Sequence, residues 1–149
     1  MKLSTRSRYG LKAVVDLAVE YGEGPVTLAQ LAGAQGISEA YLEQLLRVLR
    51  QSGIVETLRG AQGGYALCQP PDQISVEQVL SVLEGSTALT DCVDTDSSGC
   101  KNACTCSARP LFLKLQNKIN LVLSETSIQD LADDYIGQKR RLQNAKGLS

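Results

Sequence analysis

The chain has 149 residues, enough for one domain whose hydrophobic core needs no disulfide staples. Histidine is absent, which excludes Ser-His-Asp and Cys-His catalysis and any zinc site built with histidine. The sequence also lacks the glycine patterns of Walker and Rossmann phosphate-binding loops, so we do not expect an enzyme. With no signal-peptide pattern and no apolar run of about 20 residues, we expect a cytoplasmic protein without a membrane segment.

Charge is distributed unevenly along the chain. The formal net charge of −1 does not by itself favour nucleic acid as a partner. However, Lys2, Arg6, Arg8 and Lys12 all precede the first acidic residue, Asp16. This basic N-terminus can neutralise DNA phosphates, or it can be an ordinary solvated chain end.

Two helices are predicted in the first 36 residues. Apolar residues recur with a helical period over residues 8–21, which predicts a helix with one buried face. A second, short helix should begin at Thr27, because Gln30 three residues later can complete a capping box. It should end in the glycine-containing turn at residues 33–36.

A third helix is predicted from its cap at Ser38 to about residue 51, with a buried stripe of leucines. Together with the preceding helix and turn it forms a helix-turn-helix. The face opposite the leucines carries Gln44 and Arg47, side chains that can pair with adenine and guanine edges in the major groove. Taken alone, this helix can equally be an ordinary amphipathic helix with a polar outer face.

A β-hairpin is predicted directly after the third helix. Residues 53–59 and 65–68 have strand character, and the glycine-rich residues 60–64 form the turn between them. Such a hairpin after a helix-turn-helix makes a winged helix, and Arg59 at its root can reach a phosphate or the minor groove. By itself, a glycine-rich hairpin turn would indicate only a turn.

The second half of the chain contains two further helical regions around a cysteine-rich loop. Ser75 and Gln78 open a capped scaffold helix that Gly85 ends. Ser107 is expected to cap a long helix that tolerates Pro110 in its first turn. Its apolar residues are Leu111, Phe112, Leu113, Leu115, Ile119, Leu121, Val122 and Leu123.

A helix that is apolar on nearly all sides must be covered on several sides, so we expect a partner subunit to cover the long helix. The alternative is that it packs only on its own domain. After it, Thr126 or Ser127 should cap a short helix, and residues 138–149 should be a flexible tail.

The loop between these helices holds four of the five cysteines, namely Cys92, Cys100, Cys104 and Cys106. Because thiols stay reduced in the cytosol, such a cluster indicates an iron–sulfur or metal site. Zinc is an alternative occupant, and inert or redox-active thiols are another. The fifth cysteine, Cys68, is predicted to be a small buried apolar residue.

Several motifs together resemble one family, the winged-helix repressors that include the iron–sulfur cluster regulator IscR and the nitric-oxide-responsive NsrR. The likeness covers nearly the whole chain. The motifs that carry it are residues 3–9, Gly36-Ile37-Ser38, residues 41–45, Arg59-Gly60, Gly63-Gly64-Tyr65 and the cysteines Cys92, Cys100 and Cys106.

The resemblance implies a homodimer whose long helices cross and whose two winged helices read a palindromic operator in double-stranded DNA. It places base reading on Tyr41, Glu43 and Gln44 and a wing contact on Arg59. Glu43 can accept a hydrogen bond from cytosine but otherwise repels phosphate, so it can reject some operators. The full set of expected DNA-binding residues is Ser38, Tyr41, Glu43, Gln44, Arg47, Arg59, Gly60 and Gln62.

The resemblance also implies that Cys92, Cys100 and Cys106 hold an iron–sulfur cluster, [2Fe–2S] in preference to [4Fe–4S]. At the two positions where relatives supply a fourth ligand this chain has Arg109 and Arg8, and arginine does not ligate metals. Cys104 is the candidate that completes a four-thiolate set. Asp91, Asp94 and an outside ligand are the alternatives.

The resulting expectation is a mainly α fold with a small β-hairpin wing, a winged helix-turn-helix joined to a long dimerisation helix. Residues 1–84 are the DNA-binding domain, 85–107 the cluster loop, 108–137 the dimerisation and short C-terminal helices, and 138–149 the tail. The expected function is a dimeric transcription regulator that senses iron–sulfur status, an oxidant or nitric oxide. The competing function is a repressor with zinc or no metal that is controlled by a partner protein such as a metabolic enzyme.

Overall fold

The computed structural model describes residues 2–94, 101–102 and 104–147. The predicted fold class is confirmed, because the described chain is helical apart from one two-stranded antiparallel hairpin. The elements are α1 (Thr5–Val19), α2 (Leu28–Gln35), α3 (Glu39–Gln51), β1 (Val55–Leu58), β2 (Gly64–Leu67), η1 (Pro71–Gln73), α4 (Val76–Glu84), η2 (Asp91–Val93), α5 (Arg109–Glu125) and α6 (Ile128–Gly147). No helix among these residues is both long enough and apolar enough to cross a membrane.

Side-chain caps fix most helix starts where the sequence predicts them. Thr27 and Gln30 form a reciprocal capping box at α2, and Ser75 and Gln78 form another at α4. Ser38 accepts a hydrogen bond from the amide of Tyr41 at 3.2 Å and so begins α3. Because each cap involves residues only three positions apart, local sequence is sufficient to locate it.

Two predicted helix starts were wrong. The first helix begins at Thr5 rather than residue 8, because Ser4 caps the amide of Ser7. The predicted Ser107 cap does not form, and α5 begins after Ala108 with no side-chain cap. The reason is Pro110, which stands three residues after Ser107 and has no N–H for that cap to accept.

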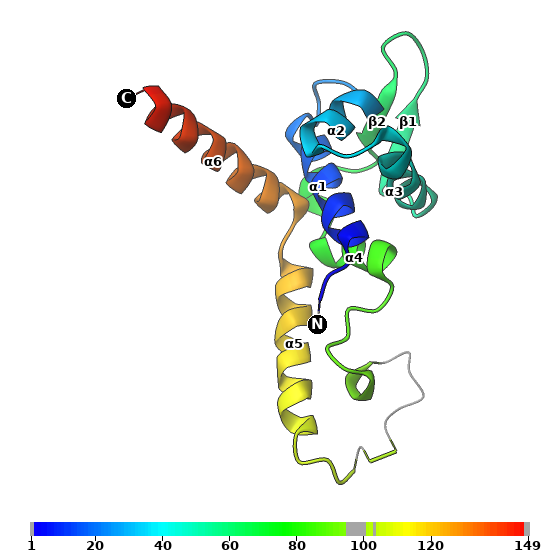
Figure 1. Cartoon of the computed structure of the whole chain (residues 1–149), viewed down its shortest axis with the longest axis vertical. Coiled ribbons are helices and arrows are strands. Elements are labelled where there is room, and N and C mark those ends of the chain that lie inside the picture. The colour runs from blue at the N-terminus through cyan, green and yellow to red at the C-terminus, as the bar shows by residue number, and fades with distance from the viewer. Residues whose placement is uncertain (1, 95–100, 103, 148–149) are drawn as a thin grey trace.

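The core lies where α1, α2, α3, α4, the hairpin and the start of α6 meet, and α6 contributes the buried Ile128 and Ala132 (Figure 1). Its fully buried side chains include Val14, Leu31, Leu42, Leu46, Leu49 and Val79. Gly10 lets α1 approach α4 closely, since a Cβ at this position would lie 2.4 Å from a methyl group of Leu83. α3 and the elements that support it therefore form one packed unit.

The wing is attached to the core by a third segment of chain. β1 pairs with β2, and Val26, just before α2, forms an isolated antiparallel bridge with Tyr65 through bonds of 2.9 and 2.8 Å. Gly64 permits this contact, because a Cβ there would lie 2.5 Å from the carbonyl oxygen of Val26. The wing is thereby fixed to the entrance of the helix-turn-helix.

α5 and α6 extend away from this unit in different directions (Figure 1). Their junction is held beside the start of α4, where the amide of Val76 donates to Thr126 at 2.9 Å and the amide of Ile128 donates to Ile74 at 2.8 Å. The predicted short last helix was wrong. α6 continues to Gly147, so residues 138–147 form an exposed extension of that helix.

Candidate DNA-binding surface and cysteine loop

The outer face of α3 is free for a partner in the monomer. Ser38, Glu43, Gln44 and Arg47 are exposed, whereas the leucines opposite them are buried. Tyr41 is half-buried, because its ring meets the ring of Tyr9 edge to face at 6.3 Å between centroids. The α1 helix thus supports the first turn of α3, where the candidate base-reading residues lie.

The tip and root of the wing also face solvent. Arg59, Gly60 and Gln62 are all exposed, and Gly60 adopts a φ of +118° that favours glycine. A hydrogen bond of 3.5 Å from the Arg50 guanidinium to the Thr57 hydroxyl joins α3 to β1. The helix and the wing are therefore connected by a side chain as well as by the chain itself.

The basic N-terminal residues Lys2, Arg6, Arg8 and Lys12 are exposed as well. Lys12 contacts α3 indirectly. Its ammonium lies 5.3 Å from the centroid of the Tyr9 ring, and that ring contacts Tyr41 of α3. This places one basic side chain close to the start of α3.

The cysteine loop contributes thiols at different depths. Cys92 and Cys106 are partly buried and Cys104 is exposed, while Cys100 lies outside the described residues. Within the described part, no group of three or more potential ligands is brought together. The described cysteines are free thiols, the form that iron–sulfur clusters and zinc require, so the chemistry of the donor set fits either group.

Cys92 has a polar neighbour in Thr90. The Thr90 hydroxyl lies 3.0 Å from the Cys92 sulfur, within hydrogen-bonding distance. Of the alternative carboxylate ligands, Asp94 already accepts a hydrogen bond from the Ser86 hydroxyl at 2.7 Å. Hydrogen bonds to a ligating sulfur tune its electron donation, so Thr90 is a residue that would act on a bound group.

Cys68 corrects an expectation, because it is exposed rather than buried. Leu67 takes the core-facing position at the end of β2, and the next side chain consequently points to the opposite side. Partial burial and the nearby Glu56 carboxylate raise the pKa of the Cys68 thiol, which favours its protonated form.

A buried glutamine joins the chain leading to the cysteine loop to α5. Gln116 is 6 % exposed, and its Oε1 accepts the amide of Leu89 at 2.6 Å. Its Nε2 donates to the Thr87 carbonyl at 3.4 Å and to Asn120 Oδ1 at 2.8 Å. Sequence reasoning missed this role, although a glutamine one helical turn from Phe112, Leu113 and Ile119 was a visible signal.

A second polar anchor lies at the start of the linker, which is the chain between α4 and η2 (residues 85–90). Glu84, the last residue of α4, accepts hydrogen bonds from the buried Ser7 hydroxyl and from the Ser4 hydroxyl, the latter at 2.8 Å. These bonds, that from Ser7 most of all, lower the pKa of the Glu84 carboxyl. The start of α1 and the start of the linker are consequently held together.

Comparison with known proteins gives consistent matches over most of the chain. Residues 3–134 match the Rrf2 family, described as an iron-dependent transcriptional regulator. The chain is 36% identical over 139 residues to the HTH-type transcriptional regulator CymR of Bacillus subtilis, covering 93% of this chain and 95% of CymR. It is 38% identical over 145 residues to IscR of Aliivibrio salmonicida, covering 97% of this chain and 85% of that protein.

Structural comparison agrees with the sequence matches. The structure of CymR, described as the global cysteine regulator of B. subtilis, superposes with a TM-score of 0.76 at 37% identity. The superposition covers 89% of this chain and 97% of that one. These relatives are transcriptional regulators and not enzymes. The chain therefore belongs to the Rrf2 family of winged-helix transcriptional regulators.

Proposed function

We propose that this DNA-binding regulator acts in the cytoplasm as a homodimer and senses iron–sulfur status, an oxidant or nitric oxide through its cysteine loop. The cluster is held by Cys92, Cys100 and Cys106, with Cys104 as the fourth ligand and [2Fe–2S] as the preferred type. The observation that carries this proposal is the Gln116 anchor, since it fastens the chain entering the cysteine loop to the helix that we assign to dimerisation.

The reading surface is formed by the outer face of α3 and the wing. Gln44 and Arg47 supply hydrogen bonds to base edges, and Arg59 contacts a phosphate or the minor groove. Glu43 restricts the operators that are accepted. The complete contact set that we propose is Ser38, Tyr41, Glu43, Gln44, Arg47, Arg59, Gly60 and Gln62.

The dimer contact is supported by an apolar stripe along α5. Leu111, Leu115 and Val122 lie on one face of the helix and are 56%, 43% and 62% exposed in the monomer. Gln116 and Asn120 lie on the opposite face and bind the linker, so the apolar stripe points away from the chain's own loop. A second copy that packs against this stripe would pair two winged helices, as a palindromic operator requires.

The chain around the cluster supplies the thiolate ligands. It also converts gain or loss of the cluster into a movement of α5. A bound cluster supplies a centre that gains or loses electrons or is destroyed by oxidants. Toward a ligating Cys92 thiolate the Thr90 hydroxyl would be the donor, and Gln116 would transmit a displacement of the linker to α5. The spacing of the two reading heads then changes, and with it the affinity for DNA.

A second function is favoured by the similarity to CymR, which is a cysteine regulator by its description. In that case the loop holds zinc or no metal, and a partner protein such as a metabolic enzyme controls DNA binding. The exposure of Cys104 is compatible with this alternative.

Anaerobic purification separates the two functions. A visible absorption spectrum with matching iron and sulfide contents supports the cluster sensor, whereas a colourless protein with zinc or no metal supports the alternative. DNA affinity is then measured at one fixed salt concentration before and after cluster removal. Equal affinities in the two states would refute the sensing mechanism.

A further inference from the structure

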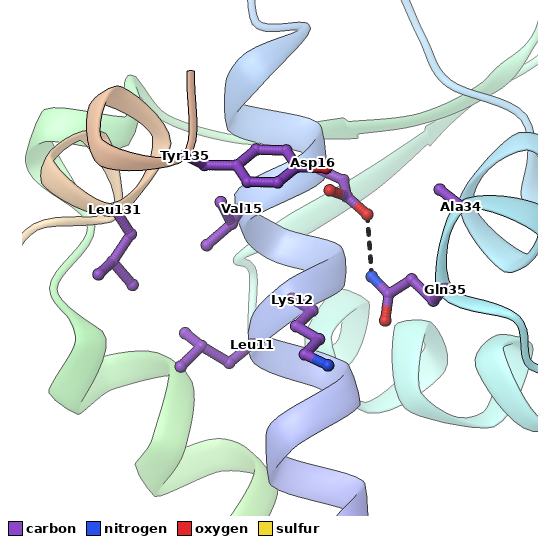
Figure 2. A pocket seen from close by; sticks show the side chains of 8 residues that line it. All are labelled: Leu11, Lys12, Val15, Asp16, Ala34, Gln35, Leu131 and Tyr135. Carbon is purple, nitrogen blue, oxygen red and sulfur yellow. Dashed lines mark hydrogen bonds between the residues drawn. The ribbon is translucent and has the colours of Figure 1, made fainter. Parts of the chain in front are cut away.

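A cavity of about 420 Å³ lies between α1, α2 and α6, and its lining includes no residue of α3 and no cysteine (Figure 2). Its apolar walls are Leu11 and Val15 from α1 and Leu131 and Tyr135 from α6. Cavities of this size accommodate small organic molecules. Its occupant would touch the first helix of the helix-turn-helix and the C-terminal helix at the same time.

The polar end of the cavity is a carboxylate paired with an amide. Asp16 Oδ2 accepts a hydrogen bond of 2.9 Å from Gln35 Nε2, which Figure 2 shows bridging α1 and α2. The other amide atom, Gln35 Oε1, is buried and has no hydrogen-bond partner in the described structure. Such an unpaired carbonyl oxygen is costly, and the soft terminal torsion of glutamine allows it to turn toward a donor in the cavity.

Two lysines lie near the carboxylate, Lys12 in the lining of the cavity and Lys139 beside Tyr135, and the charges of both act on Asp16. The Lys12 ammonium lies over the Tyr9 ring, and the Lys139 ammonium lies 4.5 Å from the centroid of the Tyr135 ring. Within the part of the chain that the structure describes, neither forms a salt bridge with Asp16. Burial is the largest influence and raises the pKa of Asp16, while the hydrogen bond from Gln35 and the charges of Lys139 and Lys12 act in the opposite direction.

We propose that this cavity binds a small molecule with a protonated primary amine on an apolar body. The ammonium group has donors for both Asp16 and Gln35 Oε1, and the apolar body packs between Val15, Leu131 and Tyr135. An alcohol would bring a donor without a charge. A carboxylate would be attracted by Lys12, but it has no donor for Gln35 Oε1 and would be repelled by Asp16. The site is independent of the cysteine loop and provides a second way to influence the DNA-binding unit.

Three matched probes test the ligand class by calorimetric titration of the full chain without DNA: 2-phenylethylamine, 2-phenylethanol and phenylacetate. We expect the amine to bind at one saturable site at least about tenfold more tightly than either of the others, since hydrogen bonds to charged groups are the stronger ones. Equal binding of the alcohol, tighter binding of phenylacetate, or no saturable binding of the amine would overturn the proposal.

Two variants test the location. Asp16→Asn removes the charge, and Ala34→Leu fills the space from an exposed position in α2 that lines the cavity. Each should weaken amine binding by at least about tenfold, while circular dichroism confirms the fold. Glu20→Gln, an exposed control one turn from Asp16 on the same side, should change affinity less than about twofold. If the control loses as much as Asp16→Asn, the binding is general attraction to acidic residues and the assigned site is wrong. Operator binding and metal content are measured separately, so their results do not depend on this titration.

Discussion

The backbone amide of Leu89 donates to Oε1 of Gln116 at 2.6 Å, a hydrogen bond between residues 27 positions apart that fastens the linker to α5. Gln116→Ala removes this acceptor and leaves the Leu89 amide without its partner. We expect a loss of about 1–3 kcal/mol in the free energy of unfolding, measured with urea. Asn117→Ala, an exposed neighbour, is the control and should change stability by less than about 0.5 kcal/mol.

In the same Gln116→Ala variant, the presence or absence of the cluster in the loop should have less effect on DNA affinity. If the anchor transmits the signal, the ratio of operator affinities with and without the cluster should fall toward one while the cluster spectrum is retained. A variant that keeps the wild-type ratio would show that α5 receives the signal by another route.

Glu84 should make stability depend on pH in the acidic range. Its pKa is lowered in the folded state, so its contribution is present above its usual pKa near 4.5 and is lost as pH falls through the lower, folded value. The stability difference between wild type and Glu84→Gln, from urea unfolding, should therefore be greatest near neutral pH and shrink below about pH 4.5. A difference that stays constant from pH 7 to pH 3 would contradict the role of the Ser4 and Ser7 hydrogen bonds.

Two glycines form a matched pair for testing the wing. Gly64→Ala would place a Cβ 2.5 Å from the carbonyl oxygen of Val26, so we expect a loss of about 1–3 kcal/mol and weaker DNA binding. Gly33→Ala, in α2, meets nothing within 4 Å and should stabilise the protein by about 0.5–1 kcal/mol. Thermal unfolding and DNA titration distinguish them, and equal effects of the two changes would argue against close packing of the wing.

Cys104→Ala tests the proposed fourth ligand. We expect reduced iron and sulfide contents and an altered absorption spectrum after anaerobic purification, because one thiolate donor is lost. Cys68→Ala is the control, since Cys68 belongs to the hairpin, and should leave the spectrum unchanged. An unchanged spectrum in Cys104→Ala would show that Cys104 is not the fourth ligand and would favour Asp91, Asp94 or an outside ligand instead.

Val122→Glu tests the dimer contact on α5. A new acidic charge on this exposed face near the C-terminal end of α5 should convert the dimer to a monomer, measured by analytical ultracentrifugation. Asn117→Glu carries the same new charge at an exposed position on nearly the opposite side of the helix and should remain dimeric. If both variants stay dimeric, the exposed stripe on α5 is not the contact between subunits.

Local sequence was sufficient for features decided within a few residues. The capping boxes at Thr27 and Ser75 and the leucine stripe of α3 depend on spacings of three or four positions, so they could be located directly. The error at Ser107 was also local, because Pro110 removes the amide that the cap needs. The end of α6 was missed because its last ten residues have no buried face, and good helix formers alone continue it.

The polar anchors could not be predicted from spacing. Ser7 and Glu84 are 77 positions apart, and only the packing of α1 on α4 brings them together. The exposure of Cys68 depends on which side of β2 faces the core. The cysteine loop has no periodic pattern. Its cysteines therefore indicate metal or cluster binding, but they do not indicate how the ligands are arranged in space.

The hydrogen bonds that hold the α5–α6 junction beside α4 make this junction a fixed point about which α5 can tilt. α5 has 17 residues and is about 25 Å long, with the cysteine loop at its far end. A tilt of α5 by about 10° around the α5–α6 junction would move its far end by about 4 Å and would hardly displace the junction itself. A small change of angle at the winged helix would therefore become a displacement of several ångströms at the loop, and under the proposed sensing function a displacement of the loop would in reverse change the angle of α5 against the DNA-binding unit.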